Sequence, residues 1–326
     1  MRVAIVGAGA VGGTIAALLS RAGHEVTITA RGEQLRTILD NGIALTGAWG
    51  DFTAHVHATD TLDRTPELAI VTTKAQDAEA ALRQNAEFLD GITVVIVQNG
   101  LDALRIAQRV LPDADVIGAL ALYAASYLSP GTVSVTTDGI TAIGGSVSGT
   151  LFVERVLGAV MPVTVASNFE GAQWTKLVVN HINALPAITG FSAQEIISDR
   201  RLRRIMTESM REAVRVGLAL GIEFEKVQGL SGTLLKLLVR LPVYVGQLIP
   251  LAMKARMGQT PNPGSTLQSI RRGQATEIDY LNGAVVAAAE RVGVATPVER
   301  ELVAMVHEVE RTGAFLTPSE VAARLP

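Results

Sequence analysis

The sequence contains no cysteine in its 326 residues. That absence excludes a disulfide framework and leaves no thiolate to act as a nucleophile or a metal ligand. A reducing compartment agrees with this composition, and we expect a cytoplasmic protein. We expect no secretory signal, because the apolar residues that would form its core already suit a first strand and the loop after it.

An excess of positive charge is also missing. Lys and Arg total 28 against 31 Asp and Glu, the formal net charge is −3, and aromatic residues make up 4%. A protein that binds nucleic acid through its phosphates needs a basic surface, so we expect no nucleic-acid partner. One local cluster, Arg200, Arg201, Arg203 and Arg204, is typical of a solvated helix end, with a phosphate-binding patch as the alternative.

Long uninterrupted apolar runs are absent, although 48% of the residues are hydrophobic. Lys236, Arg240, Pro242 and Pro250 interrupt the most apolar stretch, Leu234–Lys254. A membrane-spanning helix needs roughly 18 or more consecutive apolar residues. We therefore expect a broken, partly buried helical segment here and no membrane partner.

Histidine is scarce, with 5 residues, and the two that stand close together do not indicate a metal site. His55 and His57 alternate along a predicted strand, and no third ligand stands at a suitable spacing. We expect no metal.

The chain is rich in glycine in its first stretch, MRVAIVGAGAVGG. Val3–Val6 is a short apolar run typical of a buried parallel strand, and the glycines after it follow the G-x-G-x-x-G spacing. In a dinucleotide site the first glycine permits a tight turn, the second lets the pyrophosphate approach the backbone, and the third lets helix and strand pack closely. The helix start then presents unpaired N–H groups to the phosphates. With a simple glycine turn as the alternative, the pattern predicts a cofactor loop formed by Gly7, Ala8, Gly9, Ala10, Val11 and Gly12.

The first half of the chain alternates strands with helices, which predicts an α/β fold with a doubly wound, Rossmann-type parallel sheet. Strands are expected at Val3–Val6, Glu25–Thr29, Leu68–Thr72, Thr93–Val97 and Val116–Leu120, and helices near Gln34–Leu39, Ala78–Leu89 and Ala103–Val110. Two stretches alternate with period two, Ile43–His57 around GAWG and Gly131–Gly145. We expect both to form antiparallel hairpins at one edge of the sheet.

The second half changes to long helical stretches and predicts an all-α C-terminal domain. Helices are expected at Ala172–Leu185, Ser192–Leu220, Thr276–Val292 and Pro297–Thr312. We place an NADP-binding Rossmann domain at 1–167 and a helical substrate and catalytic domain at 168–326. A cleft between the two domains is the expected ligand site.

Three polar residues stand where predicted parallel strands end, the edge at which open α/β sheets bind ligands. Lys74 and Asn99 follow successive strands, and either one alone could be an ordinary loop residue. Arg31 follows the second strand, where an NAD site usually places an acidic residue for the ribose. A guanidinium can pair with a 2′-phosphate, so Arg31 favours NADP(H) over NAD, although Glu33 stands nearby.

The predicted helix QWTKLVVNHINALPAI carries Lys176, Asn180 and Asn183. At about 100° per residue, spacings of four and seven place all three side chains in one narrow stripe. A solvated helix side is the simpler interpretation. An exposed face usually carries several charges, however, and Lys176 is the only charged residue from there to Gln194.

A second group of polar residues lies in PNPGSTLQSIRRGQATEIDYLNG, with Asn262, Ser265 and Glu277. Thr276 followed by Asp279 resembles a capping box, which explains Asp279 by a structural role at a helix start. Glu277 adjoins the apolar positions of the same predicted helix. We expect Glu277, rather than Asp279, to face the cleft.

Taken in order, GAGAVG, Arg31, TTKAQD, QNG, WTKLVVNHIN and RRGQATEIDYLNG resemble the ketopantoate reductase (2-dehydropantoate 2-reductase) family over nearly the whole chain. TEIDYLNG together with the lysine helix is far more specific than the glycine loop. The resemblance implies a catalytic group in which Lys176 is the general acid, Asn180 orients the substrate and Glu277 binds its hydroxyl. It further implies substrate contacts from Asn99, Asn183, Asn262 and Ser265, the last two at the carboxylate end, with Lys74 and Asn99 on the cofactor side.

The chain also departs from the family pattern in three places. Many members have a second asparagine four residues after the first, where Ala184 stands here, with Asn183 one residue early. Ser269 replaces a common Asp, and the segment before Asn262 is longer than in compact members. These departures concern the substrate more than the reaction.

The sequence is thus interpreted as an NADPH-dependent reductase of a 2-oxo acid, most directly of 2-dehydropantoate to (R)-pantoate in pantothenate biosynthesis. Two alternatives stay open. One is a β-hydroxyacid dehydrogenase-like or other 2-oxo acid reductase, and the other is a non-catalytic NADP-binding regulator. The sequence does not decide the oligomeric state, and a homodimer is one state that it allows.

Overall fold

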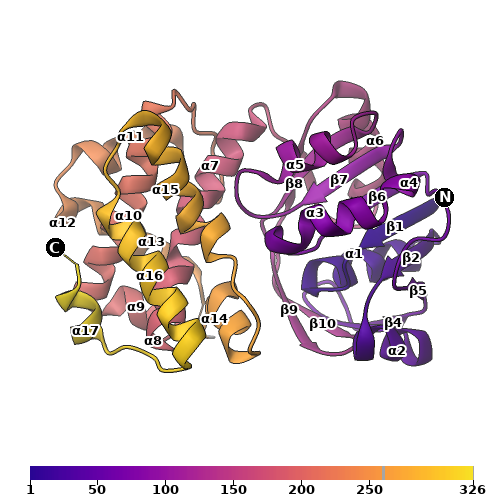
Figure 1. Cartoon of the computed structure of the whole chain (residues 1–326), viewed down its shortest axis with the longest axis horizontal. Coiled ribbons are helices and arrows are strands. Elements are labelled where there is room, and N and C mark those ends of the chain that lie inside the picture. Colours follow the sequence, from indigo (N-terminus) through magenta and orange to yellow (C-terminus); the bar gives the residue numbers. More distant parts are fainter. Residues whose placement is uncertain (259–260, 326) are drawn as a thin grey trace. The chain divides into compact units, whose positions relative to one another are not determined.

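The structure is a computed structural model that describes residues 1–258 and 261–325. The chain divides into two compact units, Met1–Phe169 and Glu170–Pro326. Every strand of the described residues belongs to the first unit, and the second unit is built from helices (Figure 1). The predicted domain boundary stands two residues before this division.

The main sheet of the first unit has the strand order β12-β11-β8-β7-β6-β1-β2-β5. Its strands are β1 (Arg2–Val6), β2 (Glu25–Thr29), β5 (His57–Thr59), β6 (Leu68–Val71), β7 (Thr93–Val97), β8 (Asp115–Ala121), β11 (Thr141–Gly144) and β12 (Val163–Val165). From β5 to β8 all neighbours are parallel, and β11 is antiparallel to β8. The predicted fold class and its five parallel strands are confirmed.

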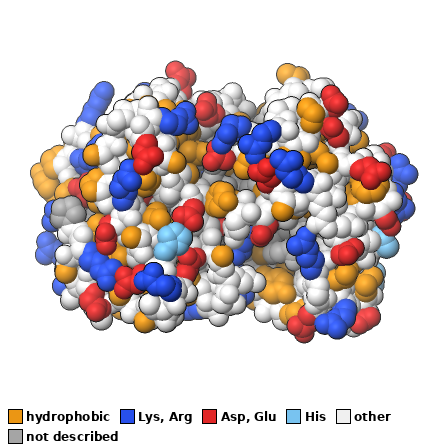
Figure 2. All heavy atoms as spheres, viewed as in Figure 1, with side chains coloured by type: hydrophobic (Ala, Val, Ile, Leu, Met, Phe, Trp, Pro, Cys, Tyr) orange, Lys and Arg blue, Asp and Glu red, His pale blue; other side chains and the backbone are white. Residues whose placement is uncertain are grey.

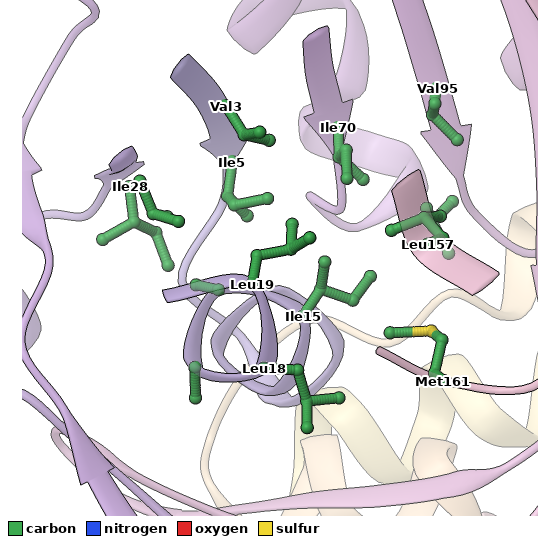
Figure 3. Packing of buried hydrophobic residues seen from close by; sticks show 14 of the residues in the cluster. Val3, Ile5, Ile15, Leu18, Leu19, Ile28, Ile70, Val95, Leu157 and Met161 are labelled. Carbon is green, nitrogen blue, oxygen red and sulfur yellow. The ribbon is translucent and has the colours of Figure 1, made fainter. Parts of the chain in front are cut away.

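Helices cover both faces of this sheet, which explains why its strands are apolar throughout rather than alternating. The helices are α1 (Ala10–Arg21), α2 (Gly32–Asn41), α3 (Ala75–Gln84), α4 (Ala86–Leu89), α5 (Ala103–Val110) and α6 (Val147–Gly158). Successive residues of a strand point to opposite faces. Val3 and Ile5 accordingly pack in one core with Ile15 of α1 (Figure 3), while Ala4 and Val6 pack in a second core with α3 and α5.

A second sheet of four strands has the order β4-β3-β10-β9. Its strands are β3 (Ile43–Gly47), β4 (Phe52–Ala54), β9 (Ala124–Ser129) and β10 (Thr132–Thr137). The predicted hairpin around GAWG is present as β3 and β4. Its predicted place at an edge of the main sheet was wrong, because both strands belong to this second sheet. The predicted hairpin over 131–145 was wrong, because β10 joins β3 and β9 whereas β11 joins the main sheet. Burial separates the two strands, since β11 is buried along its whole length and β10 alternates at first and then becomes exposed.

The second unit contains α7 (Phe169–Asn180, which begins one residue earlier), a 3₁₀ turn η1 (His181–Asn183), α8 (Ala184–Thr189), α9 (Ala193–Ser198), α10 (Arg200–Ala219), α11 (Gly232–Arg240), α12 (Val243–Gly246), α13 (Leu248–Arg256), α14 (Gly264–Arg271), η2 (Ile278–Tyr280), α15 (Asn282–Val292), α16 (Pro297–Thr312) and α17 (Pro318–Ala323). Three helices predicted as continuous are broken, at 181–183, at Asp199 and at Leu281. The apolar stretch Leu234–Lys254 is broken into α11, α12 and α13, as predicted. Within the described part of the chain, no helix has the length and apolar character needed to cross a membrane.

Two of these breaks have a local cause. Pro186 lacks an N–H, and its ring would clash with the carbonyl of Ile182 in a continuous helix. Restarting the helix at Ala184 moves Pro186 into a first turn, where proline is tolerated. At the second break, the Asp199 carboxylate accepts from the N–H groups of Arg201 and Leu202 and so begins a new helix.

Acidic and basic side chains are intermixed over the helical unit on the face drawn in Figure 2. The arginine cluster lies in the first turns of α10, where Arg201 and Arg203 have structural partners. Arg203 donates to the Ile197 carbonyl at 2.6 Å and to Gln247 Oε1 at 3.0 Å. Arg201 donates to Ser319 Oγ at 3.4 Å.

Candidate active site

The glycine loop connects β1 to α1, and two of its glycines are required by the backbone around them. Gly7 has φ +111°, a conformation that L side chains rarely adopt. A Cβ on Gly12 would overlap the carbonyl oxygen of Gly7 and the hydroxyl of Thr72. A Cβ on Gly9, by contrast, would meet nothing within 4 Å. The open space at Gly9 is where a ligand can approach the backbone.

Side chains from neighbouring elements hold this loop in place. The Gly7 N–H donates to Thr29 Oγ1 at 3.1 Å, and Thr72 Oγ1 donates to the Gly7 carbonyl at 2.8 Å. Gln34 Nε2 donates to the Ala8 carbonyl at 2.9 Å. Sequence reasoning missed these three supporting residues, because nothing in the local pattern marks them and only the fold brings them to the loop.

The start of α1 is arranged to accept an anion. Its N-cap, Gly9, provides no side-chain cap, and its first turn holds no acidic residue. The N–H groups of that turn therefore remain available as donors, and they lie at the positive end of the helix dipole. Together with the space at Gly9, this geometry fits the pyrophosphate of a dinucleotide.

Arg31, Lys74 and Asn99 lie at the same edge of the main sheet, because each follows the carboxyl end of a parallel strand. Arg31 is the N-cap of α2 after β2, Lys74 is the N-cap of α3 after β6, and Asn99 follows β7. In the sheet, β2 and β6 flank β1 and its glycine loop, and β7 lies next to β6. Arg31 is exposed, and its Nη2 donates to Gln84 Oε1 at 2.6 Å. The structure thus brings the predicted cofactor residues to one edge.

In the helical unit, Lys176 and Asn180 lie on α7 and Asn183 ends the 3₁₀ turn after it. The stripe predicted for a continuous α-helix survives this change, since residues three apart eclipse one another in a 3₁₀ turn. Asn180 is 7% exposed, and Lys176 is half-buried. Burial lowers the pKa of Lys176 to about 8, so its ammonium loses its proton more readily than that of an exposed lysine.

Asn183 lies against the segment that carries Asn262 and Ser265. A Cβ on Gly264, which has φ +69°, would overlap the side-chain oxygen of Asn183. Asn262 Oδ1 accepts from the Gly264 N–H at 2.9 Å, and the Asn262 carbonyl accepts from the Ala193 N–H at 2.8 Å. Asn262 and Ser265 are both exposed. Because Oδ1 of Asn262 holds the turn, the amide Nδ2 is the atom that can serve a ligand.

Glu277 lies on a different segment, between α14 and α15, and is half-buried. The predicted helix Thr276–Val292 and its capping box were wrong here. Thr276 Oγ1 accepts from the Ile278 N–H at 3.3 Å, and Asp279 Oδ1 contacts His307 Nε2 at 2.9 Å instead of capping the backbone. Leu281, with φ −104° and ψ −93°, breaks the helix.

Among the residues that the structure describes, no three His, Asp or Glu side chains are grouped to hold a metal ion. His55 lies just before β5 and His57 begins it. His57 Nε2 contacts Asp63 Oδ2 at 3.4 Å.

Comparison with known proteins gives the same family for both units. Residues 3–147 match the family model described as Ketopantoate reductase PanE/ApbA, and residues 168–310 match the model of its C-terminal part. The 2-dehydropantoate 2-reductase of Archaeoglobus fulgidus is 29% identical over 315 residues, which cover 95% of this chain and 98% of that protein. The enzyme of the same name from Pyrococcus horikoshii is 29% identical over 323 residues, with 96% and 99% covered.

Solved structures agree. A PanE/ApbA family ketopantoate reductase from Ralstonia eutropha superposes with a TM-score of 0.82 at 28% identity, covering 95% of this chain and 99% of the other. D-mandelate dehydrogenase with NADH and anilino(oxo)acetate has a TM-score of 0.81 at 21% identity, with 96% and 99% covered. At that identity the second likeness concerns the fold alone.

Proposed function

Since the chain belongs to the ketopantoate reductase PanE/ApbA family, we propose that it reduces a 2-oxo acid with NADPH, most directly 2-dehydropantoate to (R)-pantoate. The observation that carries this proposal is full-length similarity to proteins named 2-dehydropantoate 2-reductase, in a chain that has a half-buried lysine at the first position of its polar stripe. The reaction is a step of pantothenate biosynthesis. An enzyme of this kind acts on a small molecule and requires no metal.

We assign the cofactor to the edge of the main sheet. The loop of Gly7, Ala8, Gly9, Ala10, Val11 and Gly12 would hold the pyrophosphate against the start of α1, as its free donors and open space at Gly9 support. Arg31 would pair with the 2′-phosphate, since its guanidinium is exposed at the end of β2. Lys74 and Asn99 stand on the same side, at the ends of β6 and β7.

When bound, the nicotinamide supplies a hydride to the ketone carbon of the substrate. Negative charge then grows on the ketone oxygen, and a donor beside that oxygen lowers the barrier. Lys176 is assigned this role: its ammonium stabilises the charge and donates a proton to the oxygen. Its lowered pKa, about 8, suits a general acid that works near neutral pH.

We assign the substrate to the polar residues of the helical unit. Asn180 would orient the ketone beside Lys176, and Glu277 would accept the substrate hydroxyl. Asn262 and Ser265 would hold the carboxylate end, with Asn183 and Asn99 as further contacts. The proximity of Asn183 to the 262–265 segment supports this grouping.

Other expectations stay predictions. These are a cytoplasmic location, the domain boundary at 167/168, a cleft between the domains and the absence of nucleic-acid partners.

The test is NADPH oxidation by the full chain with a panel of 2-oxo acids. If Glu277 binds a hydroxyl, ketopantoate should exceed 2-oxoisovalerate in kcat/KM by at least about tenfold. That factor represents ~1.4 kcal/mol, which lies within the about 1–3 kcal/mol that a buried polar partner left unpaired costs. A preference for an unhydroxylated acid would indicate a reductase of another 2-oxo acid. A lack of oxidation with every acid would indicate the non-catalytic regulator.

A further inference from the structure

A buried polar cluster lies in the core of the helical unit. It consists of His181 in η1, Ser209 in α10, Asn282 in α15 and Glu299 in α16, and each of the four is at most 1% exposed. Taking a charged carboxylate out of water costs several kcal/mol unless partners compensate it. A completely buried glutamate therefore needs a specific set of donors.

Glu299 has that set, contributed by three other elements. Ser209 Oγ donates to Glu299 Oε1 at 2.8 Å, and Asn282 Nδ2 donates to Oε2 at 2.7 Å. His181 Nε2 lies 3.0 Å from Oε1 as an ionic contact. One carboxylate thus connects η1, α10 and α15 to α16.

Two of these partners adjoin the segments that carry the assigned site residues. His181 directly follows Asn180, and its Nδ1 lies 2.6 Å from the carbonyl oxygen of Leu177, the residue after Lys176. Asn282 begins α15, and only the short turn η2 and Leu281 separate it from Glu277. Glu299 therefore links the lysine helix to the segment of Glu277.

Proton counting places one proton between His181 Nε2 and Glu299 Oε1, and the raised pKa of His181 assigns it to the imidazole. A carbonyl oxygen only accepts, so His181 Nδ1 carries a proton toward Leu177. A bare Nε2 would then point a lone pair at the Glu299 oxygen, which already accepts from Ser209. A charged imidazolium against a carboxylate avoids two facing acceptors. Burial lowers the pKa of His181, but the charge of Glu299, the Leu177 carbonyl and the charge of Glu212 raise it, with a net rise.

We propose that Glu299 is a positioning residue for the reductase site: through His181 and Asn282 its carboxylate sets the lysine helix and the Glu277 segment in one fixed relation. This inference rests on the proposed function for its activity readout. Glu299 acts through His181 and Asn282, and its contact with His181 holds the helix break at 181–183 in place.

The chain offers a matched control in Glu212, a second buried carboxylate, which lies on α10 and faces the start of α16. Glu212 is 3% exposed and accepts from the N–H groups of Val298 and Glu299 at 3.2 and 2.9 Å. Its replacement should lower stability by loosening the same helix start. Glu212→Gln keeps a carbonyl oxygen for these N–H groups and leaves the side-chain partners of Glu299 in place, so KM and kcat per folded enzyme should stay near the wild type even though His181 loses one neighbouring charge.

The first measurement compares Glu299→Ala, Glu299→Gln and Glu212→Gln in the full chain with NADPH and ketopantoate. Glu299→Ala should lower kcat and raise KM, for a loss in kcat/KM of at least about tenfold. Glu299→Gln should stay within about threefold of the wild type, since its amide can accept from Asn282 and donate to a neutral His181. A merely structural role would lower the amount of active enzyme and leave KM unchanged, and that result would overturn the inference.

A second variant guards against misfolding of Glu299→Ala. Asn282→Ala removes only the link to the Glu277 segment and leaves Glu299 paired with His181 and Ser209. It should raise KM with kcat within about twofold of the wild type. An unchanged KM in folded Asn282→Ala would contradict the proposed link.

Hydrogen exchange of the ligand-free full chain separates this inference from the proposed function. Glu299→Ala should speed amide exchange in both 177–183 and 277–282, whereas Glu212→Gln should leave both segments as in the wild type. Faster exchange in one segment alone, or equally in both variants, would refute the positioning role. If the wild type oxidises NADPH with no 2-oxo acid, the proposed function fails while this exchange result still decides the inference.

Discussion

Replacing Lys176 by methionine tests the assigned general acid through the pH dependence of turnover. Burial disfavours the charged ammonium and lowers the pKa of Lys176 from 10.5 to about 8. A general acid must carry its proton, so activity should be full below this pKa and decline above it. At pH 9 about one lysine in ten would be protonated, whereas a lysine of ordinary pKa would remain almost fully charged.

The assay is kcat/KM for ketopantoate at saturating NADPH between pH 6 and about 10. The wild type should lose about tenfold per pH unit above its alkaline midpoint near 8. Lys176→Met should lower kcat by about 10²- to 10⁴-fold and abolish this decline of kcat/KM at alkaline pH. Lys236→Met changes an exposed lysine of the same unit and should keep the wild-type profile.

Folding stability should change with pH in the opposite direction, because the same pKa shift makes stability rise where activity falls. Because the folded-state pKa of Lys176 lies below its unfolded value, the unfolded chain binds more protons between about pH 8 and 10.5. The contribution of Lys176 to stability is therefore largest above that window and is lost as the pH falls through about 8.

In the activity assay, a decline of kcat/KM centred near pH 10.5, or a decline that persists in Lys176→Met, would refute the assignment of Lys176 as the general acid.

Three further predictions concern the ligands. Arg31→Ala should weaken NADPH binding by about 1.5–3 kcal/mol and leave NADH nearly unchanged, and equal losses in calorimetric titrations would remove Arg31 from the 2′-phosphate. Gly9→Ala should leave the thermal midpoint of the free protein nearly unchanged but weaken NADPH binding. Gly12→Ala should lower that midpoint, because its Cβ would overlap the loop backbone. A lowered midpoint with unchanged NADPH binding in Gly9→Ala would place the ligand elsewhere. Glu277→Ala should narrow the preference for ketopantoate over 2-oxoisovalerate, and a loss of thermal stability with an intact preference would show a structural role instead.

Several features of the site could be predicted from local pattern alone. The glycine spacing after Val3–Val6 specifies a turn, an open backbone and a close helix, and the φ of Gly7 and the contacts of Gly12 agree with two of these demands. Such features depend on a few consecutive residues and on backbone sterics. The positions of Lys74 and Asn99 at strand ends were predictable for the same reason, since short apolar runs bounded by polar residues define where strands stop.

Other features depended on contacts between distant segments. The strands β10 and β11 share one alternating pattern, and only their long-range partners separate them into two sheets. Gln34 reaches the Ala8 carbonyl across 26 positions of sequence, a contact that no local rule indicates. Asp279 looked like a helix cap, but the approach of His307 from α16 gave it a different partner.

The sequence by itself determined the strand and helix rhythm of the first unit, the cofactor loop and the polar stripe of α7, because each follows from periodicity and from the steric demands of neighbouring residues. The tertiary structure decided which strands pair, where the helices break and which buried groups meet. Glu299 illustrates the difference. In the sequence it is one acid in the first turn of a helix, and only folding places it among His181, Ser209 and Asn282. The role of a buried charge depends on the donors around it, and these donors come from three elements that only packing brings to α16.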